Sequence, residues 1–104
     1  METLDGRMEL ILKHVERALD GVKADGNRSP VTVAVVEELA KTAREATAAF
    51  LAAAPALRRE LIVALAQAAD SASVAAQADL DLRTDARALV DTAHKAVCSL
   101  VDAP

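Results

Sequence analysis

Apolar side chains recur every three or four residues along most of the chain, which is the spacing of one face of an α-helix. Residues 4–24 follow this spacing, and residues 30–53 repeat it. Both segments are therefore predicted to be amphipathic helices. The first predicted apolar stripe consists of Leu4, Met8, Ile11, Val15, Ala18 and Val22, and the second of Val36, Leu39, Ala43, Ala46, Phe50 and Ala53.

Short signals mark where these two helices begin and end. Asp25 and Gly26 supply a stop for the first helix, since glycine readily adopts the left-handed conformation of a helix cap. Ser29 followed by Pro30 is a start signal, because a side-chain cap precedes a proline at the first helical position. Pro55 ends the second helix, because the residue before a proline disfavours helical geometry.

Residues 56–103 contain no glycine and no proline, so they form either one long helix or two shorter ones. Residues 79–85 carry several aspartates and Thr84, which favour caps over helix interiors. A break there leaves four helices of nearly equal length, which an up-down bundle packs without an overhang. One long helix is favoured by an apolar stripe that continues almost in phase from the first half into the second. It passes through Leu57, Leu61, Ala64, Ala68, Ser71, Ala75, Ala78 and Leu82 and continues into Ala86, Leu89, Ala93, Ala96 and Leu100.

Composition agrees with a helical fold. Hydrophobic residues make up 53% of the chain, 25 residues are alanine, and Phe50 is the single aromatic residue. Alanine favours helices and lets them pack closely, whereas a β-sandwich needs β-branched or aromatic strands and frequent turns. The fold class is therefore predicted to be all-α: one domain over residues 1–104, an Ala-rich antiparallel up-down four-helix bundle. The alternative is three helices with a long C-terminal helix, in a dimer.

Charge limits the classes of partner. Twelve basic and sixteen acidic residues give a net charge of −4, and the longest basic run is Arg58–Arg59. Nucleic-acid binding needs clustered basic side chains, so we expect no nucleic-acid partner. The longest uncharged stretch, residues 46–57, is shorter than the roughly 20 residues of a membrane span.

Three further features bear on compartment and source. The first residues lack the basic and then apolar pattern of a signal peptide. Cys98 is the single cysteine and can form no internal disulfide. A cytoplasmic location is the expectation that follows. Arginine outnumbers lysine two to one and alanine is abundant, which suggests a GC-rich bacterial genome.

The third helical segment is apolar on more than one side. With Leu61, Ala64 and Leu65 facing the core, Ile62 and Val63 point sideways. Val74 lies on the same side as Val63. A four-helix bundle has no central helix, so such a surface suggests a partner. We expect Ile62, Val63 and Val74 to line an interface with another protein, most simply in a homodimer. The alternative is that they are isolated surface residues, which are ordinary on monomers.

One group of side chains could carry chemistry. Asp91, His94 and Cys98 have the spacing i, i+3, i+7 and share one helix face. Carboxylate, imidazole and thiolate are zinc ligands, and His14 could add a fourth from the antiparallel first helix. The simpler interpretation is structural: a half-exposed histidine and a cysteine that serves as a small apolar side chain. The spacing lacks the paired motifs that make a zinc prediction specific.

No phosphate-binding glycine loop, nucleophile elbow or other enzyme motif is present in the sequence. We therefore expect a small, non-catalytic helical module for protein–protein interaction or assembly, with no cofactor. The alternative is a helical bundle that binds a small ligand or a metal ion.

Overall fold

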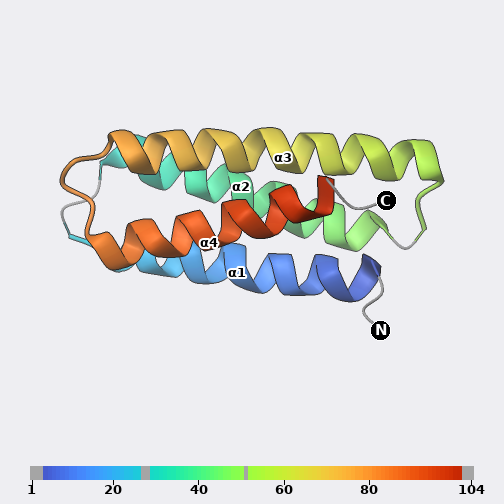
Figure 1. Ribbon diagram of the computed structural model, residues 1–104, viewed down its shortest axis with the longest axis horizontal. Coiled ribbons are helices and arrows are strands. Elements are labelled where there is room, and N and C mark those ends of the chain that lie inside the picture. The colour runs from blue at the N-terminus through green and yellow to red at the C-terminus, as the bar shows by residue number, and fades with distance from the viewer. Residues whose placement is uncertain (1–3, 27–28, 51, 102–104) are drawn as a thin grey trace.

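The computed structural model describes residues 4–26, 29–50 and 52–101, with side chains from residue 6 onward. It contains four helices, α1 (Leu4–Ala24), α2 (Pro30–Phe50), α3 (Pro55–Ala78) and α4 (Thr84–Val101). They run alternately up and down, and each packs against the next, with α4 closing on α1 (Figure 1). This is the predicted four-helix bundle. The alternative with one long C-terminal helix is wrong, because the chain leaves helical geometry between Ala78 and Thr84.

The core contains the predicted apolar stripes of α1 and α2, except that α2 ends at Phe50 rather than at the predicted Ala53. The prediction for α4 is right in part: Ala86, Ala93 and Leu100 are buried, whereas Leu89 and Ala96 are only partly buried and Val90 and Val97 lie in the core. Large side chains such as Phe50, Met8 and Leu39 are almost completely buried. Small residues fill the rest, so that helix backbones approach closely. The predicted stripe position Leu4 lies outside the residues whose side chains are described. The buried core residues of these three helices are Met8, Ile11, Val15, Ala18, Leu19, Val22, Val36, Leu39, Ala40, Ala43, Ala46, Phe50, Ala86, Val90, Ala93, Val97 and Leu100.

The predicted phase of α3 is wrong by about one residue. Ala64, Ser71 and Ala78, assigned to its core stripe, are exposed. The error arises because α3 is apolar nearly all round, so hydrophobicity alone does not distinguish its inner side from its outer side. The side chains of α3 that are buried belong to Leu65, Ala69, Ala72, Ser73 and Ala76.

Two aspartates tie together the connections at one end of the bundle. Asp79, which follows α3, accepts hydrogen bonds from the Ser29 backbone N–H at 2.9 Å and from the Thr32 hydroxyl at 2.7 Å. Asp25, which follows α1, accepts one from the Arg83 backbone N–H at 2.7 Å. The bond from the Ser29 N–H, followed by that from Thr32, lowers the pKa of Asp79 below its ordinary value. The two connections are thereby held side by side, as Figure 1 shows.

The start signal before α2 is confirmed, since Ser29 Oγ accepts a hydrogen bond from the Val31 N–H at 3.2 Å. The expected left-handed cap at Gly26 is wrong, because Gly26 has no positive φ. Instead, the Asp25 N–H bonds to the Val22 carbonyl at 3.2 Å. The Asp25 carboxylate then reaches the neighbouring connection, so the end of α1 is fixed by a long-range contact.

Two arginines serve the carboxyl ends of helices. Arg58 donates to the Phe50 carbonyl at 2.9 Å and lies 4.8 Å from the centre of the Phe50 ring. Arg87 donates to the carbonyls of Asp79 at 2.8 Å and Leu82 at 3.2 Å. Because a helix C-terminus carries partial negative charge and unpaired carbonyls, these cations stabilise the turns on both sides of α3.

Candidate metal-binding site

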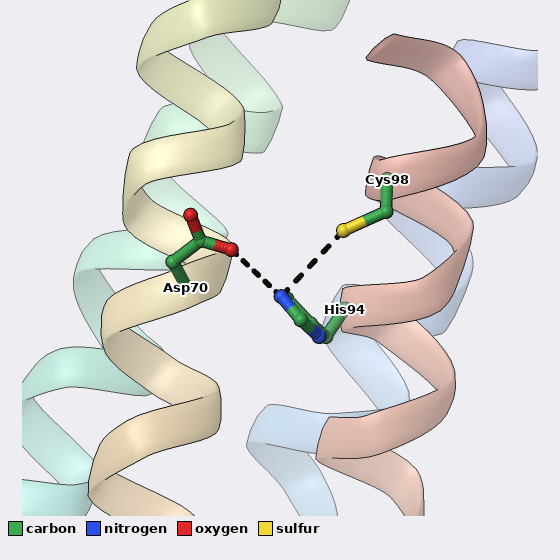
Figure 2. A group of neighbouring side chains, drawn as sticks. All are labelled: Asp70, His94 and Cys98. Carbon is green, nitrogen blue, oxygen red and sulfur yellow. Dashed lines mark hydrogen bonds and ion pairs between the residues drawn. The ribbon is translucent and has the colours of Figure 1, made fainter. Parts of the chain in front are cut away.

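Asp70, His94 and Cys98 come together on the seam between α3 and α4. Asp70 projects from α3, while His94 and Cys98 lie one turn apart on α4 (Figure 2). The Asp70 Oδ1 atom lies 2.7 Å from His94 Nε2, and the Cys98 Sγ atom lies 3.6 Å from the same nitrogen. These three potential ligand atoms all lie within 4.8 Å of one another.

The cluster is accessible from solvent. The Asp70 side chain is 65% exposed and that of His94 is 25% exposed, while Cys98 is half-buried. An ion could therefore reach the three ligand atoms without any opening of the bundle. The α4 backbone holds His94 and Cys98 in fixed relative positions, because residues four apart lie above one another on a helix.

The arrangement differs from that of a cysteine nucleophile with a histidine base. In such a system the carboxylate contacts one ring nitrogen and the nucleophile contacts the other. Here Asp70 and Cys98 both approach Nε2 of His94. The ring therefore does not relay charge from one to the other. Instead, the Asp70 oxygen, the His94 nitrogen and the Cys98 sulfur, each of which can donate an electron pair to a cation, lie within 4.8 Å of one another.

Two of the residues predicted from the sequence do not belong to this cluster. Asp91 forms an ion pair with Lys95, with 3.0 Å between Oδ2 and Nζ. His14 lies on α1, which packs against the opposite flank of α4. That flank carries Ala96, which lines the same surface hollow as residues of α1 and lies about 160° around the helix from His94. The structure thus brings together His94 and Cys98 but not His14 or Asp91.

Asp70 is the member that sequence reasoning missed, although a signal was present. In two antiparallel helices with a short connection, residues equally far from the turn lie at the same height, because both helices rise by the same distance per residue. Asp70 precedes the 79–83 connection by about as many residues as His94 follows it. Considering spacing within one helix alone concealed this partner.

A second feature is the outer surface of α3. Val63 is 54% exposed and Val74 is 66% exposed, so both remain on the surface as expected. Ile62 is partly buried and packs against the core, so its side chain is less accessible than those of the two valines. Residues 61–78 contain a single charged side chain, Asp70. We call the exposed strip formed by Val63, Gln67, Asp70 and Val74 the outer face of α3.

The low charge of α3 also makes this helix resemble a membrane-spanning segment in composition. Within the described part of the chain, it is the one helix long and apolar enough to cross a membrane, judged by length and composition alone. The core helices of soluble proteins pass the same test. In this structure α3 packs between α2 and α4. The sequence predicted that the chain has no membrane-spanning segment, and this stays a prediction.

Comparison with known proteins identifies no relatives: no protein family, no curated protein and no solved structure matches the chain. Functional inference therefore rests on the residues themselves. The surface hollows of the described residues are open grooves rather than enclosed cavities. The Asp70–His94–Cys98 cluster and the outer face of α3 are thus the two features from which a function can be argued.

Proposed function

We propose that the protein is an assembly module that forms a homodimer by packing the outer face of α3 against the same face of a second copy. The observation that carries this proposal is that valines more than half exposed occupy a helix face on which Asp70 is the only charged side chain. Burial of such a surface is favourable, and exposed apolar strips are typical of interaction sites.

The pattern of α3 fits an antiparallel pairing of identical helices. Val63 lies five residues before Ala68, and Val74 lies five residues after Ala69. A two-fold axis between residues 68 and 69 therefore places Val63 of each copy against Val74 of the other copy, so the interface contains two such pairs. Such an isologous contact needs a face that is complementary to itself under this rotation, which this face is.

The polar residues of the face obey the same symmetry. Gln67 precedes Ala68 by one residue, and Asp70 follows Ala69 by one residue. The two-fold axis places the amide of Gln67 opposite the carboxylate of Asp70 of the second copy. The amide N–H is a donor and the carboxylate is an acceptor, so this central pair is complementary. All four residues lie within about 60° of the helix surface.

Charge at the two ends of α3 points the same way. Arg59 is exposed at the fifth residue of α3, close to the N-terminal end, where the helix dipole disfavours a cation, and no acidic residue lies in the first turn. Asp81 is exposed just beyond the C-terminal end, where the dipole disfavours an anion. In the antiparallel pair, Arg59 comes within one helical turn of Asp81 of the second copy. Both unfavourable placements are thereby relieved.

The size of the face sets the expected strength. The outer face of α3 runs from Val63 to Val74, so it is about 16 Å long and about 10 Å wide. A strip of this size buries less than the roughly 1,600 Å² of a standard interface. The dimer is therefore expected to dissociate reversibly, with a Kd in the micromolar range.

Sedimentation over a range of protein concentrations tests this proposal. We expect a concentration-dependent shift from monomer to dimer. Replacing both Val63 and Val74 by Glu should weaken the dimer at least about tenfold, because the interface would bury unpaired charges. The matched control is Val31→Glu, since Val31 is 65% exposed but lies on α2. A parent chain that stays monomeric at high concentration, or an equal loss in the control, refutes the proposal.

Disulfide trapping tests the antiparallel register. In a Cys98→Ser background, a chain with both Val63→Cys and Val74→Cys should form a covalent dimer, while either substitution alone should not. The two positions of one chain are about 16 Å apart along the helix, too far for an internal disulfide. Efficient crosslinking of the single variants would indicate a parallel pairing and would contradict this arrangement.

A further inference from the structure

We propose that Asp70, His94 and Cys98 form a binding site for a divalent transition-metal ion of the zinc class. The site does not require self-association, since all three ligand atoms come from one chain, although Asp70 belongs both to this cluster and to the outer face of α3. It extends the protein's expected activity from assembly to metal binding. The sequence predicted such a site with His14, Asp91, His94 and Cys98 as ligands. The structure keeps His94 and Cys98, removes the other two and adds Asp70.

The spacing of the ligand atoms is close to what a tetrahedral ion requires. Bonds of about 2.0 Å to nitrogen and oxygen and about 2.3 Å to sulfur separate neighbouring ligand atoms by roughly 3.3–3.5 Å. The distance from His94 Nε2 to Cys98 Sγ is 3.6 Å, which is near this value. The distance from Nε2 to Asp70 Oδ1 is 2.7 Å, so the carboxylate must move away from Nε2 by about half an ångström. It must also come within about 3.5 Å of Cys98 Sγ, and the structure places these two atoms within 4.8 Å of each other. The largely exposed side chain of Asp70 permits this adjustment.

The identity of the donors selects the class of ion. A thiolate and an imidazole are preferred by Zn²⁺ and its neighbours, whereas Mg²⁺ and Ca²⁺ take oxygen ligands. Asp70 is the single oxygen donor of the cluster. A magnesium or calcium site would need several more oxygen ligands at this point, so the cluster favours zinc over the abundant hard cations.

The hydrogen-bond arrangement supports the same conclusion. A neutral imidazole carries at most one proton on Nε2, yet Asp70 and Cys98 both approach that atom. A cation between the three atoms would satisfy the carboxylate, the thiolate and the ring nitrogen at once. Since the chain supplies three ligands, the fourth position of a tetrahedron is open to water, as in zinc sites that exchange their fourth ligand.

Metal binding can be tested directly on the full-length chain without a histidine tag, after removal of adventitious ions with a chelator. Native mass spectrometry and equilibrium dialysis with Zn²⁺ should report one ion per chain. Co²⁺ should produce the near-ultraviolet charge-transfer absorption of a cobalt–thiolate bond. Mg²⁺ should not compete with either ion. Absence of zinc binding at concentrations up to about 100 μM, or of the thiolate band with Co²⁺, would overturn the proposal.

The decisive comparison uses the two histidines of the chain. His94→Gln and Cys98→Ser should each weaken zinc binding at least about tenfold, since even changes to residues behind a ligand cost this much. His14→Gln and Asp91→Asn should leave it unchanged, because neither residue belongs to the cluster. Equal losses in the controls, or unchanged binding by Cys98→Ser, would refute the ligand assignment. Circular dichroism without metal checks that each variant is folded.

The assembly proposal and the metal proposal can fail separately. The chain with Val63→Glu and Val74→Glu should still bind one Zn²⁺, because neither valine supplies a ligand. His94→Gln should still dimerise, because it removes the contact of His94 with Asp70 but leaves Asp70 itself and both valines of the outer face in place. Loss of zinc binding in the valine variant would contradict a site formed within one chain.

Discussion

Gly21 on α1 lies against the Leu89 side chain of α4, which makes it a sensitive probe of the packing of these two helices. Gly21 lies inside α1, where glycine destabilises a helix by about 1 kcal/mol relative to alanine. A Cβ atom added there would lie 2.6 Å from Leu89 Cδ1 on α4, which is too close. The obstacle is the end of a flexible side chain, so Leu89 can rotate away at a cost of roughly 0.5–1.5 kcal/mol.

These two effects nearly cancel for Gly21→Ala alone. We expect its free energy of unfolding to differ from that of the parent by less than about 0.5 kcal/mol. When Leu89 is already alanine, the clash is absent and Gly21→Ala should stabilise the fold by about 1 kcal/mol. The double-mutant cycle should therefore show a coupling energy of roughly 0.5–1.5 kcal/mol.

Urea unfolding followed by circular dichroism can measure this coupling. For a chain of this size, 1 kcal/mol shifts the midpoint by about half a molar. Additive effects, with Gly21→Ala stabilising both backgrounds equally, would mean that Leu89 does not approach Gly21. That result would refute the α1–α4 packing on which the exclusion of His14 from the cluster rests. A Gly21→Ser variant, which adds the same Cβ, should show the same sign of coupling.

Three further measurements test other parts of the bundle. Ala93 is completely buried, so Ala93→Leu should overpack the core and cost about 1–3 kcal/mol in thermal unfolding; no loss would mean that α4 is rotated. Arg87→Met should lower the free energy of unfolding by about 1–3 kcal/mol because helix-end carbonyls lose their donor, whereas Arg83→Met, whose parent side chain is 70% exposed, should change it little. The hydrogen bond from the Ser29 N–H lowers the pKa of Asp79 in the folded chain below its value in the unfolded chain. The ionised carboxylate therefore stabilises the fold at pH values above the unfolded pKa. This stabilisation is lost as the pH falls through the folded pKa. Urea unfolding between about pH 6 and pH 2 should therefore show a smaller acid-induced loss for Asp79→Asn than for the parent, and equal losses would contradict the role of Asp79.

Local signals in the sequence were enough to place the four helices. Ser29 and Pro30 mark the start of α2, and the aspartate-rich stretch at residues 79–85 separates α3 from α4, as predicted. These signals act through neighbouring backbone groups, so they can be recognised without knowledge of the fold. The long-range roles of Asp25 and Asp79 could not be recognised this way, because their hydrogen bonds reach the opposite connection. The sequence alone suggested a helix stop at Asp25 and helix caps in residues 79–85.

The candidate site was predicted in part for a similar reason. His94 and Cys98 are one turn apart on one helix, so their proximity follows from helix geometry. Asp70 depends on which helix lies next to α4 and on which of its sides faces that neighbour. Assigning α1 instead of α3 as the source of the additional ligand led to His14. Rotation of a helix about its axis is set by packing over its whole length, and a short motif does not contain that information.

The incorrect phase of α3 and the proposal for its outer face have the same physical origin. A helix in the wall of a bundle ordinarily carries charges on its outer side, and these charges reveal its rotation in the sequence. Across residues 61–78, α3 carries Asp70 alone. Selection for solubility of a monomer would have placed more charges there, because the exposed positions tolerate them at little cost in stability. A helix whose two sides are similarly apolar is expected where both sides are covered, and pattern-based prediction commonly fails at positions kept for function rather than for folding. The pairing of Val63 with Val74 of a second copy would supply that second cover, and the sedimentation experiment decides whether it does.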